Sequence, residues 1–320
     1  MVSQEILERY APIVHFHPFE RYFPCSLEWL LEHCCLRHTR SSLRILRPTR
    51  RDLLAHWQAD HPAGSTPYLD IASSGYGGHL ESAPSYVTVQ EWDSCYEITY
   101  LMLYAYQGPQ TARWHLSRQP YDCLVRDFGR HQGDLEWVSL SLDKDRLQPL
   151  EIGLQAHGEV RMVPWSRCPR HRDHPLIRAA LHGHACALQG EPDRVVHRRL
   201  GGILSICDLF CDGGQVWRPS PRRLGLDEKG EPIGDEVWAK FQGRIGRRLD
   251  NHFRRLTRLD GEAVGLLPRL LGRFVRLAEV RGWLPPSIRQ AEGTPGPGDP
   301  GRWFMHGQRR SGAPLRQCPY

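Results

Sequence analysis

The stretch HQGDLEWVSLSLD, residues 131–143, decides the fold prediction for this chain. Side chains alternate between the two faces of a β-strand, so Asp134 and Glu136 share a face with the apolar residues at every second position after them. Two carboxylates on an apolar face are costly to desolvate unless a cation, an arginine or shared protons compensate them. His131 completes the pattern H-x-x-D-x-E, which predicts a half-site for a divalent cation. The residues also allow a structural interpretation, in which Asp134 caps a turn and Glu136 pairs with an arginine.

A second stretch, YEITYLMLYAY at residues 96–106, is aromatic and apolar on both faces. This pattern is typical of the central strand of a sandwich that is covered on both sides. Residues 151–157 predict another strand, followed by a turn and a return strand. Residues 39–93 are rich in Arg, Ser, Gly and Pro and predict long loops around a short helix near residues 52–58. Together the patterns predict a mainly β fold, an antiparallel β-sandwich with long loops.

The sequence divides into a β-sandwich domain at residues 1–248, a basic amphipathic helical region at 249–290, and a Pro/Gly-rich linker with a C-terminal tail at 291–320. In the helical region, apolar residues recur at helical spacing: Leu267, Leu270, Leu271, Phe274 and Leu277. Arginines lie on the opposite face of this predicted helix. Such a helix can lie on an anionic membrane, but packing against the domain is the commoner arrangement.

The chain of 320 residues is long enough to bury a sizeable core, and its formal net charge of +6 comes from scattered arginines. No basic stripe with stacking aromatics is present, so we expect no nucleic-acid partner. The first residues lack the pattern of a signal peptide, and no run approaches the roughly 18 apolar residues of a membrane span. The ten cysteines show no paired zinc spacing. We therefore expect a reduced, cytoplasmic protein with no transmembrane segment, whose contact with a membrane would be peripheral.

Several separated stretches resemble one family, the fungal vacuolar protein sorting-associated protein 62 family. The match covers roughly residues 10–246, and the order and spacing of the motifs make it specific. The stretches are YAPIVHFHPFERYFP at 10–24, YLMLYAYQG at 100–108, HQGDLEW at 131–137, AHG at 156–158, HPLIRAALHGHA at 174–185 and VWAKFQGRIG at 237–246.

The chain departs from the family's usual pattern H-x-G-D-W-E-H. Leu135 replaces the tryptophan and Trp137 replaces the final histidine, whereas Asp134 and Glu136 are kept. A related pattern occurs in the secreted necrosis- and ethylene-inducing-like proteins, in which a β-sandwich holds a divalent cation with His, Asp and Glu of the motif and one further Asp. The residue here nearest to that last position is the neutral Gln107.

The resemblance implies one shared polar site, formed by His131, Asp134, Glu136, His157 and His184. His131, Asp134 and Glu136 are the expected metal ligands, for calcium, magnesium, manganese or zinc, and no organic cofactor is expected. If the protein is an enzyme, Asp134, Glu136, His157 and His184 are the expected catalytic residues. The alternative for each histidine is a structural imidazole that donates to the backbone.

Two classes of function follow. In the first, the site anchors a small molecule, a lipid head-group or a glycan, and the protein acts in ligand binding or vacuolar trafficking. In the second, the protein is an enzyme, either a hydrolase in which the carboxylates hold a metal and His157 or His184 is the general base, or a cyclase in which Asp134 and Glu136 share protons in an apolar cavity lined by residues 100–106. Binding is the favoured interpretation, because the sequence contains no recognisable nucleophile or oxyanion motif.

Overall fold

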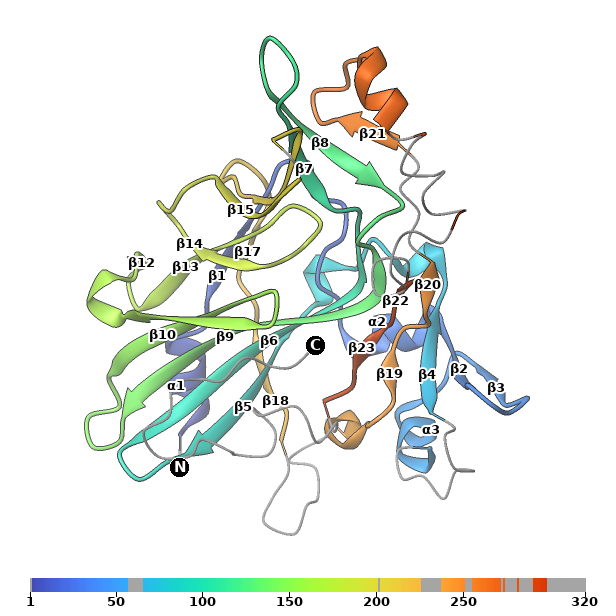
Figure 1. Ribbon diagram of the computed structural model, residues 1–320. Helices are drawn as coiled ribbons and strands as arrows, with labels where there is room; N and C mark the ends of the chain where they lie inside the picture. Colours follow the sequence, from blue (N-terminus) through green and yellow to red (C-terminus); the bar gives the residue numbers. More distant parts are fainter. Residues whose placement is uncertain are drawn as a thin grey trace.

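A six-stranded sheet forms the centre of the molecule in the computed structural model, which describes residues 2–56, 66–200, 202–225, 237–250, 255–271, 273, 281 and 290–297. Its strands lie in the order β11 (Glu159–Pro164), β10 (Pro149–Ala156), β9 (His131–Asp143), β6 (Cys95–Gln107), β5 (Ser85–Glu91) and β18 (Pro221–Arg223). Figure 1 shows β5, β6, β9 and β10 side by side. All neighbouring pairs are antiparallel except β5 and β18.

Strands β6 and β9 are the longest, with 13 residues each, and they are buried on both faces. One face carries Tyr100, Met102 and Tyr104 into the first hydrophobic core, and the other carries Leu101 and Leu103 into the second. The prediction of a central strand covered on both sides is therefore confirmed. The sheet needs two covering layers, because apolar residues at consecutive positions would otherwise face water.

The first face packs against the β1 sheet. This sheet has the order β12 (Arg170–His171), β13 (His174–Ala179), β1 (Ile13–Phe16) and β17 (Val216–Trp217), and β14 (Cys186–Leu188) pairs with β13. Strands β1 and β13 are parallel. Helix α1 (Gln4–Arg9) and the short 3-10 helix η3 (Trp165–Arg167) lie at this layer, and the first core contains residues from both the β1 sheet and α1.

The second face packs against the β4 sheet, whose order is β23 (Thr294–Pro295), β19 (Arg244–Ile245), β4 (Pro67–Ile71), β2 (Cys34–His38) and β3 (Arg44–Leu46). Helix α2 (Leu27–Glu32) begins after Ser26, whose side chain accepts a hydrogen bond from the Trp29 backbone N–H and caps the helix. Helices α3 (Arg50–Ala55), η1 (Ser73–Gly75) and η4 (Val237–Lys240) also lie on this side, whereas Leu80 of η2 (Leu80–Ser82) packs against the first core.

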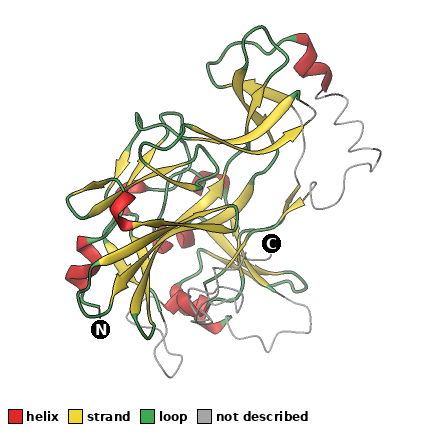
Figure 2. Ribbon diagram, turned by 60° about the vertical axis from the view of Figure 1, so that its left-hand side comes forward, coloured by secondary structure: helices red, strands yellow, loops and turns green. Residues whose placement is uncertain are grey.

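The β8 sheet has the order β15 (Arg194–Leu200), β16 (Leu204–Leu209), β7 (Thr111–Trp114), β8 (Tyr121–Arg126) and β21 (Arg255–Arg258). Its end formed by β8 and β21 projects from the other sheets in both views (Figures 1 and 2). A two-stranded ribbon, β20 (Leu249–Asp250) with β22 (Gln290–Ala291), completes the described strands. The helices are short and lie at the edges of the sheets (Figure 2), so the fold is the predicted mainly β, mostly antiparallel sandwich.

Parts of the sequence-based prediction differ from the structure in detail. Residues 39–93, predicted as loops around one helix, contain the strands β3, β4 and β5, and the helix lies at Arg50–Ala55. Residues 266–271 and 273 of the predicted amphipathic helix are helical, and Leu271 packs against the third core. Phe274 and Leu277 of that prediction lie outside the described residues, as does the tail at 301–320.

The boundary predicted at residue 248 remains a prediction. Strand β21, which follows it, pairs with β8, and β22 and β23, which fall partly or wholly within the predicted linker, pair with β20 and β19. The nine cysteines of the described part of the chain form no disulfide bonds. Among the described helices, none has the length and hydropathy that crossing a membrane requires.

Candidate functional site

Gly133 determines the backbone conformation at the start of β9 and so the direction of the side chains there. Its φ of +67° lies in the left-handed region, and a Cβ placed on it would lie 1.9 Å from the backbone oxygen of Ile245. The alternation of β9 is broken there, since the side chain of Gln132 bonds to the backbone of Ile71 in β4. From Asp134 onward the strand alternates as the sequence predicts, with Val138 and its successors in the first core.

Asp134 and His184 form a buried pair. Asp134 Oδ2 lies 3.1 Å from His184 Nδ1, and the His184 side chain has no exposed surface. The imidazole stacks on the Tyr104 ring at a centroid distance of 3.8 Å and an interplanar angle of 6°. A carboxylate at Nδ1 favours the tautomer that carries its proton there, which leaves the Nε2 lone pair free. Nε2 is buried and has no hydrogen-bond partner among the described residues.

Glu136 lies two residues further along β9 and is 6% exposed. The Gln155 amide of the neighbouring strand β10 donates to this carboxylate when its nitrogen is turned toward it. Cys186 of β14 lies beside these groups. Burial raises the pKa of the Cys186 thiol, and Glu136, Asp134 and Asp208 raise it further, so the sulfur remains protonated and is not a nucleophile.

His131 is held by other partners. Its Nδ1 lies 2.7 Å from the Gly133 oxygen, and its Nε2 lies 2.9 Å from Oε1 of Gln107. Both ring nitrogens are therefore engaged at the end of the β6–β9 pair. The structure does not bring His131, Asp134 and Glu136 together as a group of metal-donor atoms, so their joint role as ligands remains a prediction.

A different group of donor atoms does converge, and we name it the outer triad: His157, His197 and Asp208. Asp208 Oδ2 lies 2.9 Å from His157 Nε2 and 2.8 Å from His197 Nε2, and the two nitrogens lie 3.0 Å apart. In the described part of the chain this is the one set of three His, Cys, Asp or Glu side chains whose donor atoms meet in this way. The side chains of His157 and His197 are 43% and 27% exposed, whereas that of Asp208 is 3% exposed.

Local backbone structure places each member of the outer triad. His157 and Gly158 form the two-residue loop between β10 and β11, and both have positive φ, as a type I′ hairpin requires. His197 is the extra residue at a bulge in β15, where the register with β16 shifts between Val196 and Arg198. Such bulges redirect a side chain. Asp208 lies on β16, opposite Val195 of β15.

The electrostatics of the outer triad favour an ionised carboxylate. Burial alone would raise the pKa of Asp208, but the hydrogen bonds and charges of His157 and His197 outweigh it and hold the pKa below its usual range. Conversely, burial would lower the pKa of His157, but the hydrogen bond to Asp208 raises it above the usual value. The charge of Asp134 also raises the pKa of His157.

The three donor atoms match the ligand set of a metal ion. Around a tetrahedral zinc ion with bonds near 2.0–2.1 Å, neighbouring ligand atoms lie about 3.3 Å apart, slightly more than the separations of 2.8–3.0 Å seen here. Small side-chain shifts would accommodate an ion. With three protein ligands, the fourth position is left for water or a ligand, as in catalytic zinc sites.

The sequence prediction located part of this region. It named His157 and His184, and the structure places His157 in the outer triad and His184 against Asp134. It missed His197 and Asp208. Asp208 had a signal, because it lies in the apolar run LSICDLF, where a carboxylate is as costly as at Asp134. No signal in the sequence indicated His197, because the direction of its side chain depends on the bulge in β15.

The match to a family model agrees with the resemblance seen in the sequence. The family model for vacuolar protein sorting-associated protein 62 matches residues 2–190, more than half of the chain. Among solved structures, Necrosis and Ethylene inducing Protein 2, from the causal agent of cocoa's Witches Broom disease, is 13% identical with a TM-score of 0.37, over 76% of this chain and 81% of that chain. NLPPya in complex with mannosamine is 11% identical with a TM-score of 0.39, over 76% of this chain and 80% of that one. No curated protein matches the chain.

The matched residues 2–190 make up more than half of the chain and include most of the central sheet. This chain therefore belongs to the vacuolar protein sorting-associated protein 62 family.

Proposed function

We propose that this chain is a binding protein that holds a divalent transition-metal ion at His157, His197 and Asp208 and accepts a small polar ligand at the open side of that ion. The observation that carries the proposal is the convergence of two imidazole nitrogens and one carboxylate oxygen within 3.0 Å of one another. No two of these atoms can remain so close without a shared proton or a cation.

The donor set favours zinc among the four cations considered from the sequence. Calcium and magnesium prefer six or more oxygen ligands, whereas the outer triad offers two nitrogens and a single carboxylate. Imidazole with one carboxylate suits zinc and other first-row transition metals. Because the carboxylate is already ionised and one histidine must lose its proton to ligate, metal binding should release protons.

The exposure of the three side chains supports a ligand as well as a metal. Asp208 is buried at the back of the group, and the partly exposed rings of His157 and His197 leave one side accessible to solvent. A sugar hydroxyl, a lipid head-group oxygen or the carboxylate of another small molecule can occupy the position that water would otherwise take. The family name refers to vacuolar protein sorting, and for this chain such a role is a proposal built on ligand binding.

Cobalt substitution tests this proposal directly. Co²⁺ added to metal-free protein should give the visible absorption of a tetrahedral or five-coordinate ion, and azide should change that spectrum by entering the open position. The His157→Ala/His197→Ala variant should give the spectrum of hydrated cobalt. The variant His171→Ala, which removes an exposed histidine of β12, is the matched control and should bind cobalt as the unaltered chain does. An azide-insensitive spectrum would contradict the open position.

One observation favours a second candidate function, metal-assisted hydrolysis. The Nε2 atom of His184 is buried and unpartnered among the described residues, while Asp134 holds Nδ1. This pairing favours the tautomer that a general base needs, and a substrate could reach the fully buried Nε2 atom only if the surrounding side chains moved. If the chain is a hydrolase, the His184→Gln variant should retain its metal and lose turnover of an ester or phosphoester substrate. Unchanged turnover in that variant would exclude His184 as the base.

A further inference from the structure

The outer surface of the β4 sheet carries an unusual set of charges. Its inner face contributes Cys34, Leu36, Leu69 and Ile71 to the second core. Because side chains alternate, the residues between them face outward. The register across four strands places Arg244, Tyr68, Arg37 and Arg44 in one row on this outward face, and we call it the arginine row.

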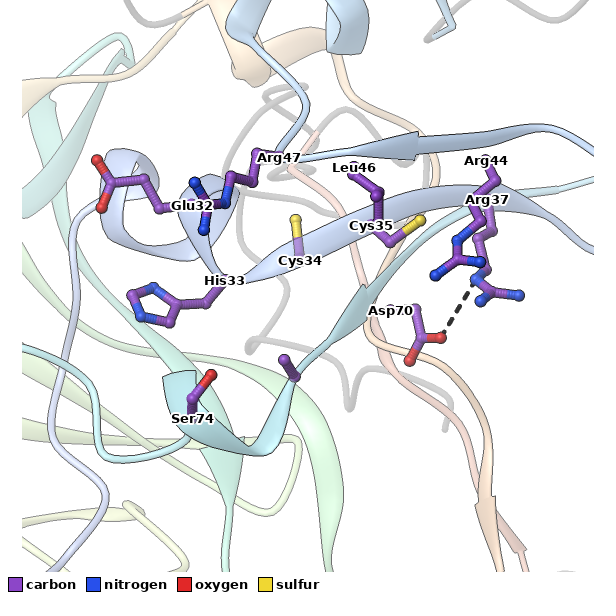
Figure 3. Close-up of a pocket in the computed structure, with 11 residues that line it drawn as sticks. Glu32, His33, Cys34, Cys35, Arg37, Arg44, Leu46, Arg47, Asp70 and Ser74 are labelled. Carbon is purple, nitrogen blue, oxygen red and sulfur yellow. Dashed lines mark ion pairs between the residues drawn. The ribbon is translucent and has the colours of Figure 1, made fainter.

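The arginine row brings like charges together. Arg37 of β2 and Arg44 of β3 are directly opposite one another. Like charges at such positions destabilise a sheet, so the arrangement costs stability unless an anion compensates it. Figure 3 shows the Arg37 and Arg44 side chains lying side by side.

The carboxylates nearby compensate only part of this charge, and at one end of the row Arg244 is paired with Glu292. Asp70 lies 3.3 Å from Arg37 and 3.3 Å from Arg247, so one carboxylate is shared by two cations. Arg44 and Arg47 have no side-chain partner in the ranges of the chain that the structure describes. Arg47 has a φ of +49°, and its backbone N–H donates to the Cys34 oxygen, which fixes its position at the edge of the hairpin.

Three of these arginines, Arg37, Arg44 and Arg47, line a cavity of about 690 Å³. Arg37 and Arg44 lie at one end of it, and Arg47 lies near Glu32 and His33 (Figure 3). A second cavity of about 590 Å³ continues along β19 and includes Arg40, Arg244, Arg247 and Arg248. The two cavities together hold seven arginines and three carboxylates. The lining of these two cavities therefore carries a net positive charge.

We propose that the arginine row and Arg47 form a binding site for an anion that carries phosphate groups. The guanidinium group presents paired N–H donors that match phosphate oxygens, and a cavity of about 690 Å³ is in the size range of small-molecule sites. The Cys34 thiol at the base of the cavity adds no negative charge, because burial raises its pKa. The site shares no residue with the outer triad and does not depend on a metal ion.

Pyrophosphate is the first probe, titrated into the full chain by calorimetry at low ionic strength. The Arg44→Gln/Arg47→Gln variant should bind it at least about tenfold more weakly, since two charge-assisted contacts are lost. Its thermal midpoint should be equal to or above that of the unaltered chain, because like charges are separated, and this establishes that it is folded. The matched control is Arg118→Gln/Arg146→Gln, which removes the same charge from exposed positions elsewhere and should bind as the unaltered chain does.

Two further variants separate binding at the arginine row from other sources of the measured heat. Binding that persists in His157→Ala/His197→Ala excludes chelation at the outer triad as the source of the heat. The Asp70→Asn variant should bind pyrophosphate more tightly, because the competing carboxylate is gone. Equal weakening in both double arginine variants would show a general charge effect and overturn the proposal, as would unchanged binding in Arg44→Gln/Arg47→Gln.

The source of the phosphate is distinguished with vesicles. Sedimentation with phosphatidylcholine vesicles that contain phosphatidylinositol 4,5-bisphosphate, but not with phosphatidylcholine alone, and its loss in Arg44→Gln/Arg47→Gln would identify a lipid head-group. Binding of pyrophosphate without sedimentation would identify a soluble phosphorylated ligand. Binding of neither probe would refute the site.

Discussion

Two groups of the same residue types lie close together and differ in what surrounds them. Asp134, Glu136 and His184 are almost fully buried, and each has a partner within the protein, with only the Nε2 atom of His184 left over. In the outer triad, the donor atoms face one another and two of the three side chains are partly exposed. The motif H-x-x-D-x-E thus contributes groups that have partners within the protein, whereas the donor atoms that could hold a cation together belong to residues outside it.

The difference follows from desolvation. A buried carboxylate must be compensated at all times, so Asp134 is paired in the folded chain with or without a ligand. A partly exposed group tolerates exchange of its partners, because water can replace them. We therefore expect changes in the buried group to act first on stability, and changes in the outer triad to act first on binding.

The largest expected effect is on stability, at Asp134. The Asp134→Ala variant leaves both ring nitrogens of the buried His184 without a partner, and we expect the free energy of unfolding to fall by about 3 kcal/mol. Urea denaturation measures this change. Asp145→Ala, an exposed position in the loop between β9 and β10, is the control and should change it by less than about 0.5 kcal/mol. A loss as small as that of the control would show that Asp134 does not hold His184.

The next effect is on binding, at the outer triad. We expect His157→Ala/His197→Ala to weaken zinc binding by at least about a hundredfold, because two of three ligands are lost, while the metal-free stability changes by less than about 1 kcal/mol. Competition with a chromogenic chelator measures the affinity. If the pair of substitutions unfolded the protein as strongly as Asp134→Ala does, the distinction between the two groups would fail.

A third effect depends on pH and concerns His182, next to the buried group. Burial lowers its pKa below the ordinary value of 6.5, and the neighbouring His184 lowers it further, although Glu20 opposes the shift. Below pH 6.5 the unfolded chain therefore binds a proton that the folded chain does not, and stability falls as the pH falls toward the lowered pKa. The His182→Gln variant should lose less stability than the unaltered chain between pH 7 and pH 5, measured by urea denaturation. Identical pH dependence would show that another group is responsible.

The smallest effect is on the reactivity of the cysteine thiols, which reports whether solvent reaches the buried group. Cys186 is buried and its pKa is raised by burial and by the surrounding carboxylates, whereas Cys211 is partly exposed. In the native protein, a thiol reagent should label Cys211 and leave Cys186 unlabelled, as mass spectrometry of the digested protein can show. Rapid labelling of Cys186 would mean that the buried group opens to solvent.

The sequence predicts the central sheet well, because both faces of residues 96–106 are apolar and residues 134–142 alternate strictly. These patterns depend on local geometry alone. The strands of the β4 sheet were not predicted, since they are short and carry arginines and cysteines on one face. That pattern resembles a polar loop until the row of arginines is brought together by pairing.

The candidate site was predicted only in part for the same reason. Asp134 is identified by the cost of a carboxylate on an apolar face, and His157 and His184 by resemblance to the family. His131 shares that motif, but Gly133 changes the local backbone and His131 bonds to Gln107. His197 reaches the outer triad through a bulge in β15, and no periodicity in the sequence indicates such an irregularity.

The central claim is that a metal ion binds at the outer triad, and metal content tests it most directly. Protein purified without chelator is incubated with zinc, passed over a desalting column and analysed for bound metal by elemental mass spectrometry. The three proteins compared are the unaltered chain, His157→Ala/His197→Ala and Asp134→Asn/Glu136→Gln. We predict one zinc ion per chain in the first and third proteins and none in the second. Zinc retained by His157→Ala/His197→Ala but lost from Asp134→Asn/Glu136→Gln, or absent from all three, would contradict the account.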